Sequence, residues 1–514
     1  MGSDHHHHIV MLPFMALGHL IPFLELAKQI KQRTTGFTIT IASTSLNIQY
    51  LQSTISSSSS ISSSSGESTI DFAVLPFNSS DYALPPNTEN TENVPLTEIG
   101  EFFSASLNLE APVRKLIADI TAREGTAPLC IISDPFFGWA TNVAESLNTV
   151  NITFTTGGAY GTLAYISLWL HLPHFHTDSE EFTVLGFPER CRFHRSQLHP
   201  FMRAANGKDL WSRFFQPQIS LSLKSSGWLT NTAEEIEPFG MEIFRNYIKL
   251  PLWSIGPLLP QSALKKSSST SGSSISTQRT GKKLGIPAEE CFQWLNLQRP
   301  NSVLYISFGS QNTIRATQMM ELAKGLEKSE KNFIWVIRPP LGFDIKGEFR
   351  SEWLPEGFEE RVRGNKQGLV VRNWAPQLEI LSHESTGAFL SHCGWNSVVE
   401  SLSQGVPIMG WPMAAEQSYN SKMLMEEMGV SVELTRGVQN EIVGEKVKEL
   451  IEMVMDENGK GGEMRKKAGE IREKIRAAVR YEGNEAGSSV KAMDDFLNYV
   501  LENRQERESK IQVV

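Results

Sequence analysis

The feature that most constrains the fold of this chain is an alternation of short apolar strands and helical stretches that occurs twice. In the first half, an apolar strand at His8–Phe14 precedes a helix at Leu20–Arg33 and a second strand at Phe37–Ala42. This order predicts a parallel sheet with right-handed crossover connections. The pattern restarts with a strand at Val303–Phe308 and continues to a strand at Val406–Met409. We therefore expect two consecutive α/β domains.

The stretch between the two halves has a different composition. Residues 261–283 are rich in Ser, Thr, Lys and Gly and hold almost no large apolar side chains, which is typical of a flexible linker. The length of 514 residues suits two domains of about 200 to 250 residues each. We expect an N-terminal domain at 1–258, a linker at 259–284, a second domain at 285–485 and a helical C-terminal segment at 486–514.

Two other biased stretches are not expected to contribute to a core. Residues 53–69 are mostly serine, so a surface loop is expected there. The run His5–His8 is better explained as an expression tag than as a metal site, because it is short and no distant set of ligands accompanies it. The four cysteines are widely scattered, so neither zinc-like spacing nor a disulfide framework is present.

Charge and hydropathy narrow the class of partner. The formal net charge is −9, with 40% hydrophobic and 20% charged residues, so the chain is globular and has no basic excess for nucleic acid or anionic membranes. No signal peptide and no apolar run of about 20 residues is found. We expect a cytoplasmic monomer that acts on small molecules, without a cofactor, a metal or an integral membrane segment.

A histidine and an aspartate follow two strands of the first half. Ligands of open parallel sheets bind outside the carboxyl ends of the strands. His19 comes after the first strand, at the start of a helix whose partial positive charge disfavours the imidazolium form, as a general base requires. Asp134 ends the strand Leu129–Ser133 and could bond the second imidazole nitrogen of His19. Taken alone, a histidine at such a turn is more often a structural hydrogen-bonding residue, and an aspartate before a proline is often a turn former.

The stretch from Trp374 to Gln417 carries more chemistry. A strand at Gly387–Leu390 leads through a tight loop into a helix, whose first amide groups form an anion site. Gly394 permits close approach of a ligand, and Asn396 is expected as the N-cap of this helix. A diphosphate fits such a site. His392 and Ser397, in the first turn of the helix, offer hydrogen-bond donors to it. The loop Gly309–Ser310, which follows another strand, offers further donors.

Other residues of this stretch suit the rest of a nucleotide sugar. Trp374 offers a flat face on which a base can stack. Glu400 lies one helical turn after Asn396 and can accept bonds from both ribose hydroxyls. Glu416 and Gln417 follow the next strand, and together they offer the acceptors and donors that sugar hydroxyls need.

This ordered set resembles the signature of the plant UDP-dependent glycosyltransferases of family 1. The motif His-Cys-Gly-Trp-Asn-Ser at 392–397 is intact, and the similarity extends over nearly all of the chain except the serine-rich stretch and the linker. The other segments that carry the resemblance are Pro13–Pro22, Ser133–Phe136, Trp253–Pro257 and Ser307–Ser310.

The resemblance implies the GT-B fold, in which two Rossmann-like domains with parallel sheets face each other across a cleft, and an inverting transfer that gives a β-glucoside. It implies His19 as the base with Asp134 as its partner, and a C-terminal helix that returns to the N-terminal domain. Its UDP-sugar site comprises Trp374, Ala375, Gln377, His392, Trp395, Asn396, Ser397, Glu400, Glu416, Gln417, Ser310 and Thr156.

Within that site, the resemblance places Trp395, Glu416 and Gln417 on the sugar, and Gln417 is usually associated with glucose. Many family members carry Asp at the position of Glu416, and Glu keeps the carboxylate. UDP-glucose is therefore the expected co-substrate. Phe14 and Phe136 flank the proposed base and are candidate walls for a small apolar acceptor such as a phenolic, a flavonoid or a terpenoid.

Two alternatives differ in class. An NAD-dependent oxidoreductase would carry a G-x-G-x-x-G turn after the first strand, and neither Met15–His19 nor Gly157–Gly161 matches it. A protein of the same fold that binds nucleotide or hydrophobic ligand without catalysis would be expected to lose the base, whereas His19 and Asp134 are both present.

Overall fold

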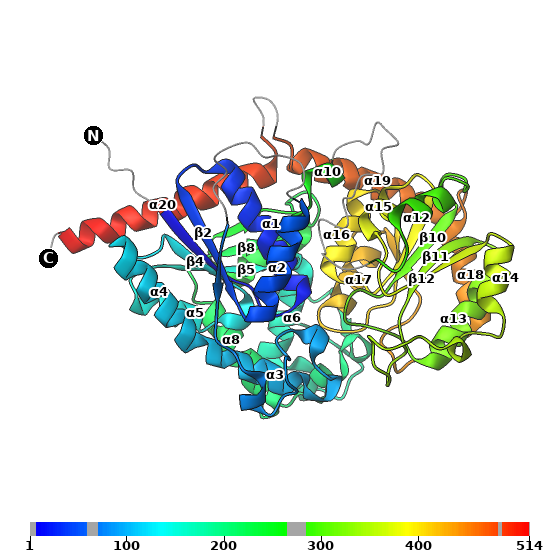
Figure 1. The fold of residues 1–514 in the computed structure, drawn as a ribbon, viewed down its shortest axis with the longest axis horizontal. Helices are drawn as coiled ribbons and strands as arrows, with labels where there is room; N and C mark the ends of the chain where they lie inside the picture. Colours follow the sequence, from blue (N-terminus) through cyan, green and yellow to red (C-terminus); the bar gives the residue numbers. More distant parts are fainter. Residues whose placement is uncertain (1–6, 59–69, 265–283, 482–485, 513–514) are drawn as a thin grey trace. The chain divides into compact units, whose positions relative to one another are not determined.

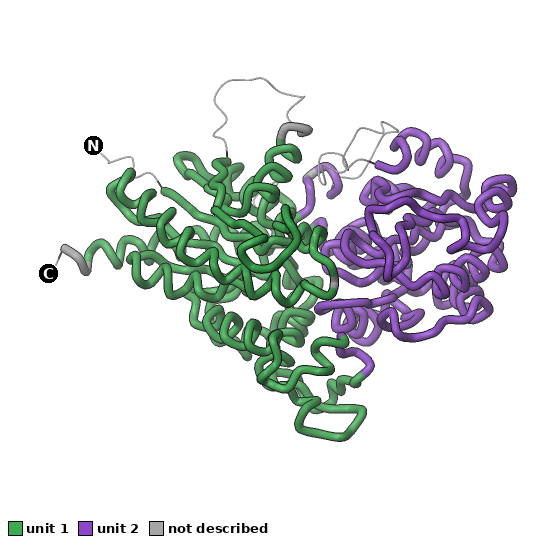
Figure 2. Tube along the Cα trace, turned by 60° about the horizontal axis from the view of Figure 1, so that its bottom comes forward, with its two compact units in different colours: residues 1–195, 200–258, 477–514 green, residues 196–199, 259–476 purple. Residues whose placement is uncertain are grey.

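The computed structural model describes residues 7–58, 70–264, 284–481 and 486–512. They form two compact units, which Figure 2 distinguishes by colour. Unit 1 comprises Met1–Arg195, Pro200–Leu258 and Ala477–Val514, and unit 2 comprises Ser196–His199 and Leu259–Arg476. Most of the expected linker, residues 265–283, lies outside the described residues.

The sheet of unit 1 has seven strands among the described residues, and every neighbouring pair is parallel. Its inner strand β1 is apolar from Ile9 to Leu12 and buried from His8 onward, as expected for a parallel strand covered on both faces. In spatial order the strands are β3 (Asp71–Val74), β2 (Phe37–Ser43), β1 (His7–Leu12), β4 (Cys130–Ser133), β5 (Asn151–Thr155), β8 (Trp228–Thr230) and β9 (Leu252–Ser254).

Helices cover both faces of this sheet, with α1 and α2 on one face and α4, α5 and α8 on the other (Figure 1). A two-stranded antiparallel pair, β6 (Glu181–Phe182) and β7 (Phe193–His194), lies apart from the sheet. The helices are α1 (Leu17–Arg33), α2 (Ser45–Ser58), α3 (Ile99–Ser106), α4 (Glu110–Glu124), α5 (Ala140–Ser146), α6 (Ala159–His171), α7 (Pro200–Ala204), α8 (Leu210–Ser222), α9 (Pro238–Ile248) and α20 (Ser488–Gln512).

The last helix, α20, completes the core of unit 1. Its residues Met493, Phe496, Leu497 and Val500 are buried in one cluster with residues of β1, β2 and α1. The Phe496 ring lies 5.5 Å from the Trp253 ring of β9, centroid to centroid. Figure 1 shows α20 in red along this unit. Residues from both ends of the sequence therefore share one hydrophobic core.

Three expectations for the first half are corrected. Helix α1 begins at Leu17 rather than Leu20, so His19 lies in its first turn. Helix α2 continues to Ser58, so the serine-rich stretch is helical at its start, and residues 59–69 lie outside the described residues. His7 and His8 belong to β1, because the His8 ring is buried and bonds Glu124 (2.7 Å) and Thr40 (2.8 Å). The described half of the histidine run is thus part of the fold.

The sheet of unit 2 has six strands among the described residues, again all parallel. In spatial order they are β12 (Gly368–Arg372), β11 (Asn332–Ile337), β10 (Val303–Ser307), β13 (Thr386–Ser391), β14 (Ile408–Gly410) and β15 (Ser431–Glu433). The helices are α10 (Gln261–Leu264), α12 (Ala288–Leu295), α13 (Ala316–Ser329), α14 (Phe358–Gly364), α15 (Gln377–Ser382), α16 (Trp395–Ser403), α17 (Gln417–Glu426), α18 (Gly444–Met455) and α19 (Lys460–Ala478).

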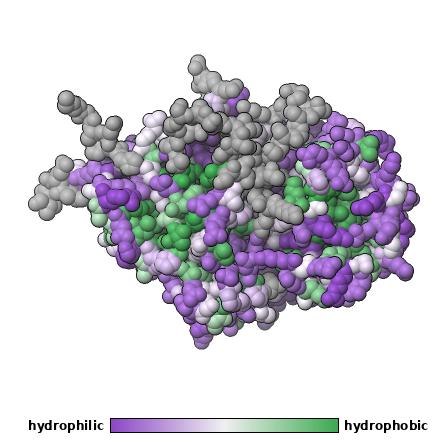
Figure 3. Space-filling view, viewed as in Figure 1, coloured by the Kyte–Doolittle hydropathy of each residue, from purple (hydrophilic) through white to green (hydrophobic). Residues whose placement is uncertain are grey.

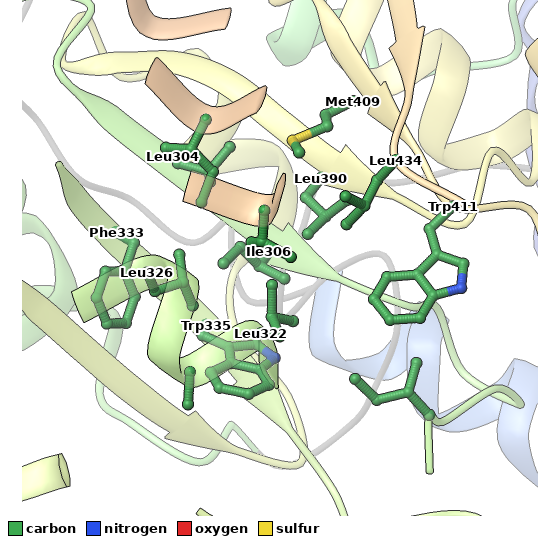
Figure 4. Packing of buried hydrophobic residues seen from close by; sticks show 14 of the residues in the cluster. Leu304, Ile306, Leu322, Leu326, Phe333, Trp335, Leu390, Met409, Trp411 and Leu434 are labelled. Atoms are coloured by element: carbon green, nitrogen blue, oxygen red, sulfur yellow. The ribbon is translucent and has the colours of Figure 1, made fainter. Parts of the chain in front are cut away.

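The core of unit 2 lies between its sheet and helices α13 and α18. Figure 4 shows Leu304 and Ile306 of β10 packed with Leu322 of α13 and with Trp335 of β11. The strands read as apolar runs because both faces are covered. This packing fixes the carboxyl ends of β10, β12, β13 and β14, and these ends carry the residues described below.

The face in Figure 3 carries mostly hydrophilic residues over the described surface, with hydrophobic residues gathered in patches. Among the described residues, no helix combines the length and the apolar character that crossing a bilayer demands.

Candidate active site

In unit 1, the structure brings His19 and Asp134 together. His19 lies in the first turn of α1 after β1, and Asp134 follows the adjacent strand β4. His19 Nδ1 lies 2.5 Å from Asp134 Oδ2, and the Phe136 amide donates to Asp134 Oδ1 at 3.0 Å. The Asp134 side chain is fully buried, whereas that of His19 is 25% exposed. The carboxylate is therefore held in place, and the imidazole keeps an open side.

Aromatic rings surround this pair. The His19 ring lies 5.7 Å from that of Phe14 and 5.5 Å from that of Phe136, centroid to centroid. Phe14 is buried behind the site, at 1% exposure, and Phe136 is partly exposed. Both predicted wall residues therefore contact the histidine, but only Phe136 presents a face to a ligand.

Sequence reasoning missed most of this aromatic cluster. Phe103 of α3 lies 5.8 Å from Phe136 and 5.3 Å from Trp211 of α8, and Tyr165 of α6 lies 6.2 Å from Phe136. All of these rings are partly exposed. The signal available was the aromatic run in α8, where Trp211 precedes two phenylalanines, and the pair at 102 and 103. The sequence did not indicate that α3, α6 and α8 bring their rings together at Phe136.

Thr156 lies in the loop between β5 and α6, and buried polar groups of unit 1 hold this loop. The Thr230 hydroxyl donates to the Gly157 carbonyl at 3.0 Å, and Asn231 Nδ2 donates to the Thr156 carbonyl at 3.2 Å. The buried Glu237 carboxylate accepts the first two amides of α6, those of Ala159 (3.0 Å) and Tyr160. Burial raises the pKa of Glu237 to about 7.

In unit 2, a histidine sits between two glycines. His392 follows β13 and Gly309 follows the adjacent strand β10. A Cβ on Gly309 would lie 2.6 Å from His392 Nε2, and one on Gly394 would lie 2.5 Å from the same atom. Both glycines are therefore required by the ring. Burial, and then the nearby Arg338 charge, lowers the pKa of His392 to about 4, so its ring is neutral at pH 7.

The loop after His392 is tightly constrained. Cys393 has a positive φ of 63°, which is costly for a residue with a Cβ and is typical of functional loops. The Cys393 amide donates to Ser391 Oγ at 3.1 Å, and Asn420 of α17 donates to the Cys393 carbonyl at 3.0 Å. Asn420 also donates to Glu416 Oε1 at 3.3 Å. No motif indicated that Asn420 links this loop to Glu416.

Helix α16 begins two residues earlier than the N-cap prediction requires. Gly394 is the N-cap, without a side-chain cap, and the helix starts at Trp395. Asn396 is therefore inside the first turn, and its expected role as N-cap is wrong. The reason is that Gly394 already has the extended backbone of a cap. The first amides of a helix suit an anion, and Trp395 and Asn396 stand at this helix start.

Gln377 forms hydrogen bonds with two other predicted site residues. Gln377 Nε2 donates to Glu400 Oε2 at 2.6 Å and to Ser397 Oγ at 3.0 Å, while the Tyr305 hydroxyl donates to Gln377 Oε1 at 3.3 Å. Ser397 and Glu400 lie on successive turns of α16, and Gln377 begins α15. The carboxylate that is expected to bind ribose is thus held in place from the side. Trp374, partly exposed, and buried Ala375 lie in the turn between β12 and α15.

Gln417 is oriented by its own helix start. Its Oε1 accepts the amides of Met413 and Ala414, each at 2.9 Å. The amide nitrogen of the side chain is therefore the group that remains for a ligand. Glu416 stands beside it as the N-cap residue of α17. Trp395 is buried at the start of α16.

The comparisons with known proteins agree with this arrangement. Residues 6–260 match the model described as "Glycosyltransferase, N-terminal domain", and residues 282–465 match "UDP-glucoronosyl and UDP-glucosyl transferase". UDP-glycosyltransferase 92A1 of Arabidopsis thaliana is 41% identical over 96% of this chain and 97% of its own length. Crocetin glucosyltransferase 3 of Crocus sativus is 44% identical over 88% of this chain and 91% of its own length.

The chain belongs to the plant UDP-dependent glycosyltransferases of family 1. It is a UDP-glycosyltransferase with the GT-B fold of two Rossmann-like domains. A solved structure with the same fold is that of Glycyrrhiza uralensis UGT73P12 complexed with glycyrrhetinic acid 3-O-monoglucuronide, with 25% identity, a TM-score of 0.80 and coverage of 98% of each chain. The family models, the two relatives and the solved structure reported above are all glycosyltransferases, and none of them is an NAD-dependent oxidoreductase.

Proposed function

We propose that this glycosyltransferase transfers glucose from UDP-glucose to a hydroxyl of a small apolar plant metabolite, with inversion, to give a β-glucoside. The observation that carries the proposal is the His19–Asp134 pair set among partly exposed aromatic rings. A base beside an apolar wall suits an acceptor that is mostly ring and carries one reactive hydroxyl. Phenolics, flavonoids and terpenoids have this character.

The reaction we propose is a single displacement. His19 takes the proton of the acceptor hydroxyl while its oxygen attacks the anomeric carbon, and the bond from that carbon to the diphosphate oxygen breaks. Asp134 holds the imidazole by Nδ1, so Nε2 is the nitrogen that accepts the proton, and the carboxylate stabilises the imidazolium formed. One displacement inverts the anomeric centre, so an α-linked donor yields a β-product.

The leaving diphosphate needs stabilisation without a metal ion in this proposal. The first amides of α16, the neutral His392 side chain and Ser310 can donate hydrogen bonds to it as charge develops. Trp374 would stack on uracil and the ribose hydroxyls would donate to Glu400. Glu416, the side-chain amide nitrogen of Gln417 and Trp395 would bind the sugar. We propose Thr156 as a donor to a phosphate or to the sugar.

The donor assignment rests on Gln417 and on the relatives. Two relatives are named as glucosyltransferases for crocetin and for flavonoids, the latter from Fragaria ananassa. We extend glucose from those proteins to this chain as a proposal. We also propose a cytoplasmic location, because the four cysteines are buried and unpaired, as in reducing compartments.

The experiment that tests the proposal combines purified full-length protein with UDP-glucose and a panel of phenolic, flavonoid and terpenoid alcohols, with mass detection of glucosides and NMR assignment of the anomer. UDP-galactose serves as the matched donor. A β-glucoside that forms without added metal and in the presence of chelator supports the proposal. An α-linked product contradicts the single displacement. Loss of activity with chelator contradicts metal independence. Transfer of galactose but not of glucose contradicts UDP-glucose as the donor.

A further inference from the structure

A single arginine, Arg338, binds the loop that holds Ser310. This loop follows β10, and Arg338 follows the neighbouring strand β11. The Arg338 guanidinium donates to the carbonyl oxygens of Gly309, Ser310 and Asn312, the last at 2.9 Å. Three carbonyl groups of four successive residues thus turn toward one cation. None of the motifs that predicted the donor site includes Arg338.

This arrangement sets where the loop amides point. In a trans peptide, the amide of one residue points away from the carbonyl of the residue before it. Arg338 binds the Gly309 carbonyl, so the Ser310 N–H is directed away from the guanidinium. The amides of Gly309 and Ser310 donate no hydrogen bond within the described residues. With Gly309 at a φ of 74°, such a loop presents N–H groups to an anion.

A second tie supports the same geometry. The Thr313 hydroxyl donates to the Pro339 carbonyl at 2.9 Å, so the far end of the loop is bound to the residue that follows Arg338. The loop is therefore held at both ends by the end of β11. The Gly309 end lies against His392, which connects the loop to the start of α16.

We propose that Arg338 is a positioning residue for the sugar diphosphate: by binding three carbonyl oxygens, it fixes the Gly309–Ser310 loop with its donors directed at the phosphates. This inference rests on the proposed UDP-glucose site. The arginine fork, rather than a point charge, is the required group, because several carbonyls must be bound at once in a fixed plane. Its positive charge adds to burial, the larger cause, in lowering the pKa of the neighbouring His392.

The test compares three full-length variants by calorimetric titration with UDP-glucose and by NMR titration with uridine. Arg338→Gln removes the fork and the charge, and Arg338→Lys keeps only the charge. Arg363→Gln is the matched control, since Arg363 is exposed on α14. We expect both Arg338 variants to bind UDP-glucose about tenfold or more weakly, the scale of losing charge-assisted hydrogen bonds. Uridine affinity should be unchanged, because base and ribose are bound elsewhere.

The outcomes separate this inference from the proposed function. Wild-type protein that fails to bind UDP-glucose overturns both. If the wild type binds it and Arg338→Gln binds it equally well, only the role of Arg338 is refuted. Wild-type affinity in Arg338→Lys shows that charge alone suffices and contradicts the fork. Equal loss of uridine and UDP-glucose affinity in Arg338→Gln shows general damage to unit 2 and refutes a specific effect on the phosphates.

Discussion

Asp134 binds His19 through one carboxylate oxygen and caps the following turn through the other. Its Oδ2 lies 2.5 Å from His19 Nδ1, and its Oδ1 accepts the Phe136 amide. From the sequence, Asp134 could have been either a catalytic partner or a turn former, and the structure shows that one residue does both. The turn therefore fixes the carboxylate that orients the imidazole, and the same turn places Phe136 beside the His19 ring.

The first prediction concerns the base. His19→Ala should lower turnover at least about 100-fold, the lower range for loss of a general base, because the variant lacks the imidazole that is proposed to take the acceptor proton. The measurement is the initial rate with an alcohol acceptor at saturating UDP-glucose. His176→Ala, an exposed histidine of the same unit, is the control and should leave the rate unchanged. A wild-type rate in His19→Ala refutes the assignment.

The second prediction separates the two ends of the donor. Trp374→Ala should weaken UDP binding, because a stacked base loses its aromatic face, while the preference among UDP-sugars stays the same. Gln417→Ala should change the preference among UDP-sugars and leave UDP affinity nearly unchanged, since the Gln417 amide nitrogen is proposed to bind the sugar and not the uracil. Calorimetry with UDP and rates with UDP-glucose and UDP-galactose measure both. Unchanged UDP affinity in Trp374→Ala would contradict the proposed orientation of the nucleotide.

The third prediction concerns the contact between Gly309 and His392. Gly309→Ala adds a Cβ that would lie 2.6 Å from His392 Nε2, at a φ of 74°. The ring and loop must shift, and a positive φ costs about 1 kcal/mol with a Cβ. We expect UDP-glucose affinity to fall about tenfold or more. Gly364→Ala, where a Cβ meets nothing within 4 Å, is the control. Equal affinities in the two variants would show that the loop tolerates the shift.

The fourth prediction is a pH dependence of stability. The Glu237 pKa is about 7 in the folded protein, against an ordinary value of 4.5. The folded state therefore holds more protons between these values, and the contribution of Glu237 to the free energy of unfolding falls as pH rises from about 4.5 to 7. Above the folded pKa this contribution is lost. The glutamine variant, Glu237→Gln, cannot titrate and should lack this part of the slope.

Urea unfolding of wild type and Glu237→Gln at several pH values from 5 to 8 measures the difference. Glu242→Gln, at an exposed position of the same helix α9, should keep the wild-type slope. Parallel pH profiles for wild type and Glu237→Gln would show that the buried carboxyl does not change its protonation in this range.

The fifth prediction compares two deletions. Removal of Lys491 onward deletes Met493, Phe496, Leu497 and Val500, each of which is at most 7% exposed. Each such side chain contributes about 1.5 to 3 kcal/mol by burial, so unit 1 should unfold at a lower temperature. Shortening the linker by several positions within residues 265–283, after helix α10, should change melting and UDP binding little, since loop-length costs are small. Wild-type melting of the truncated protein, or loss of UDP binding after linker shortening, would contradict this.

The strands, and the position of the candidate donor residues after the strands of unit 2, could be predicted because their signals are local. Buried parallel strands read as apolar runs, and the stretch from Trp374 to Gln417 places its polar residues after successive strands. The N-cap of α16 is predicted two residues too late, at Asn396 instead of Gly394. Asn396 has a side chain that caps helices well, whereas Gly394 caps this helix by its extended backbone alone, which no side chain signals.

What the sequence could not predict depends on contacts between distant elements. Arg338 has no motif, and its role becomes visible only when β11 lies beside β10. The rings of Phe103 and Trp211 converge on Phe136 from separate helices. His8 was interpreted as part of a tag because its partners, Thr40 and Glu124, lie far along the chain.

The return of α20 to unit 1 has a consequence for synthesis of the chain. A ribosome makes all of unit 2, up to Arg476, before it makes Met493 and Phe496. The first 258 residues therefore leave the ribosome with an apolar surface beside β9 and α1 that their own helix does not yet cover. Such transiently exposed surface is prone to aggregation. Unit 2 has its whole sequence available to fold first, and the earliest-made half of this enzyme is the last to close its core.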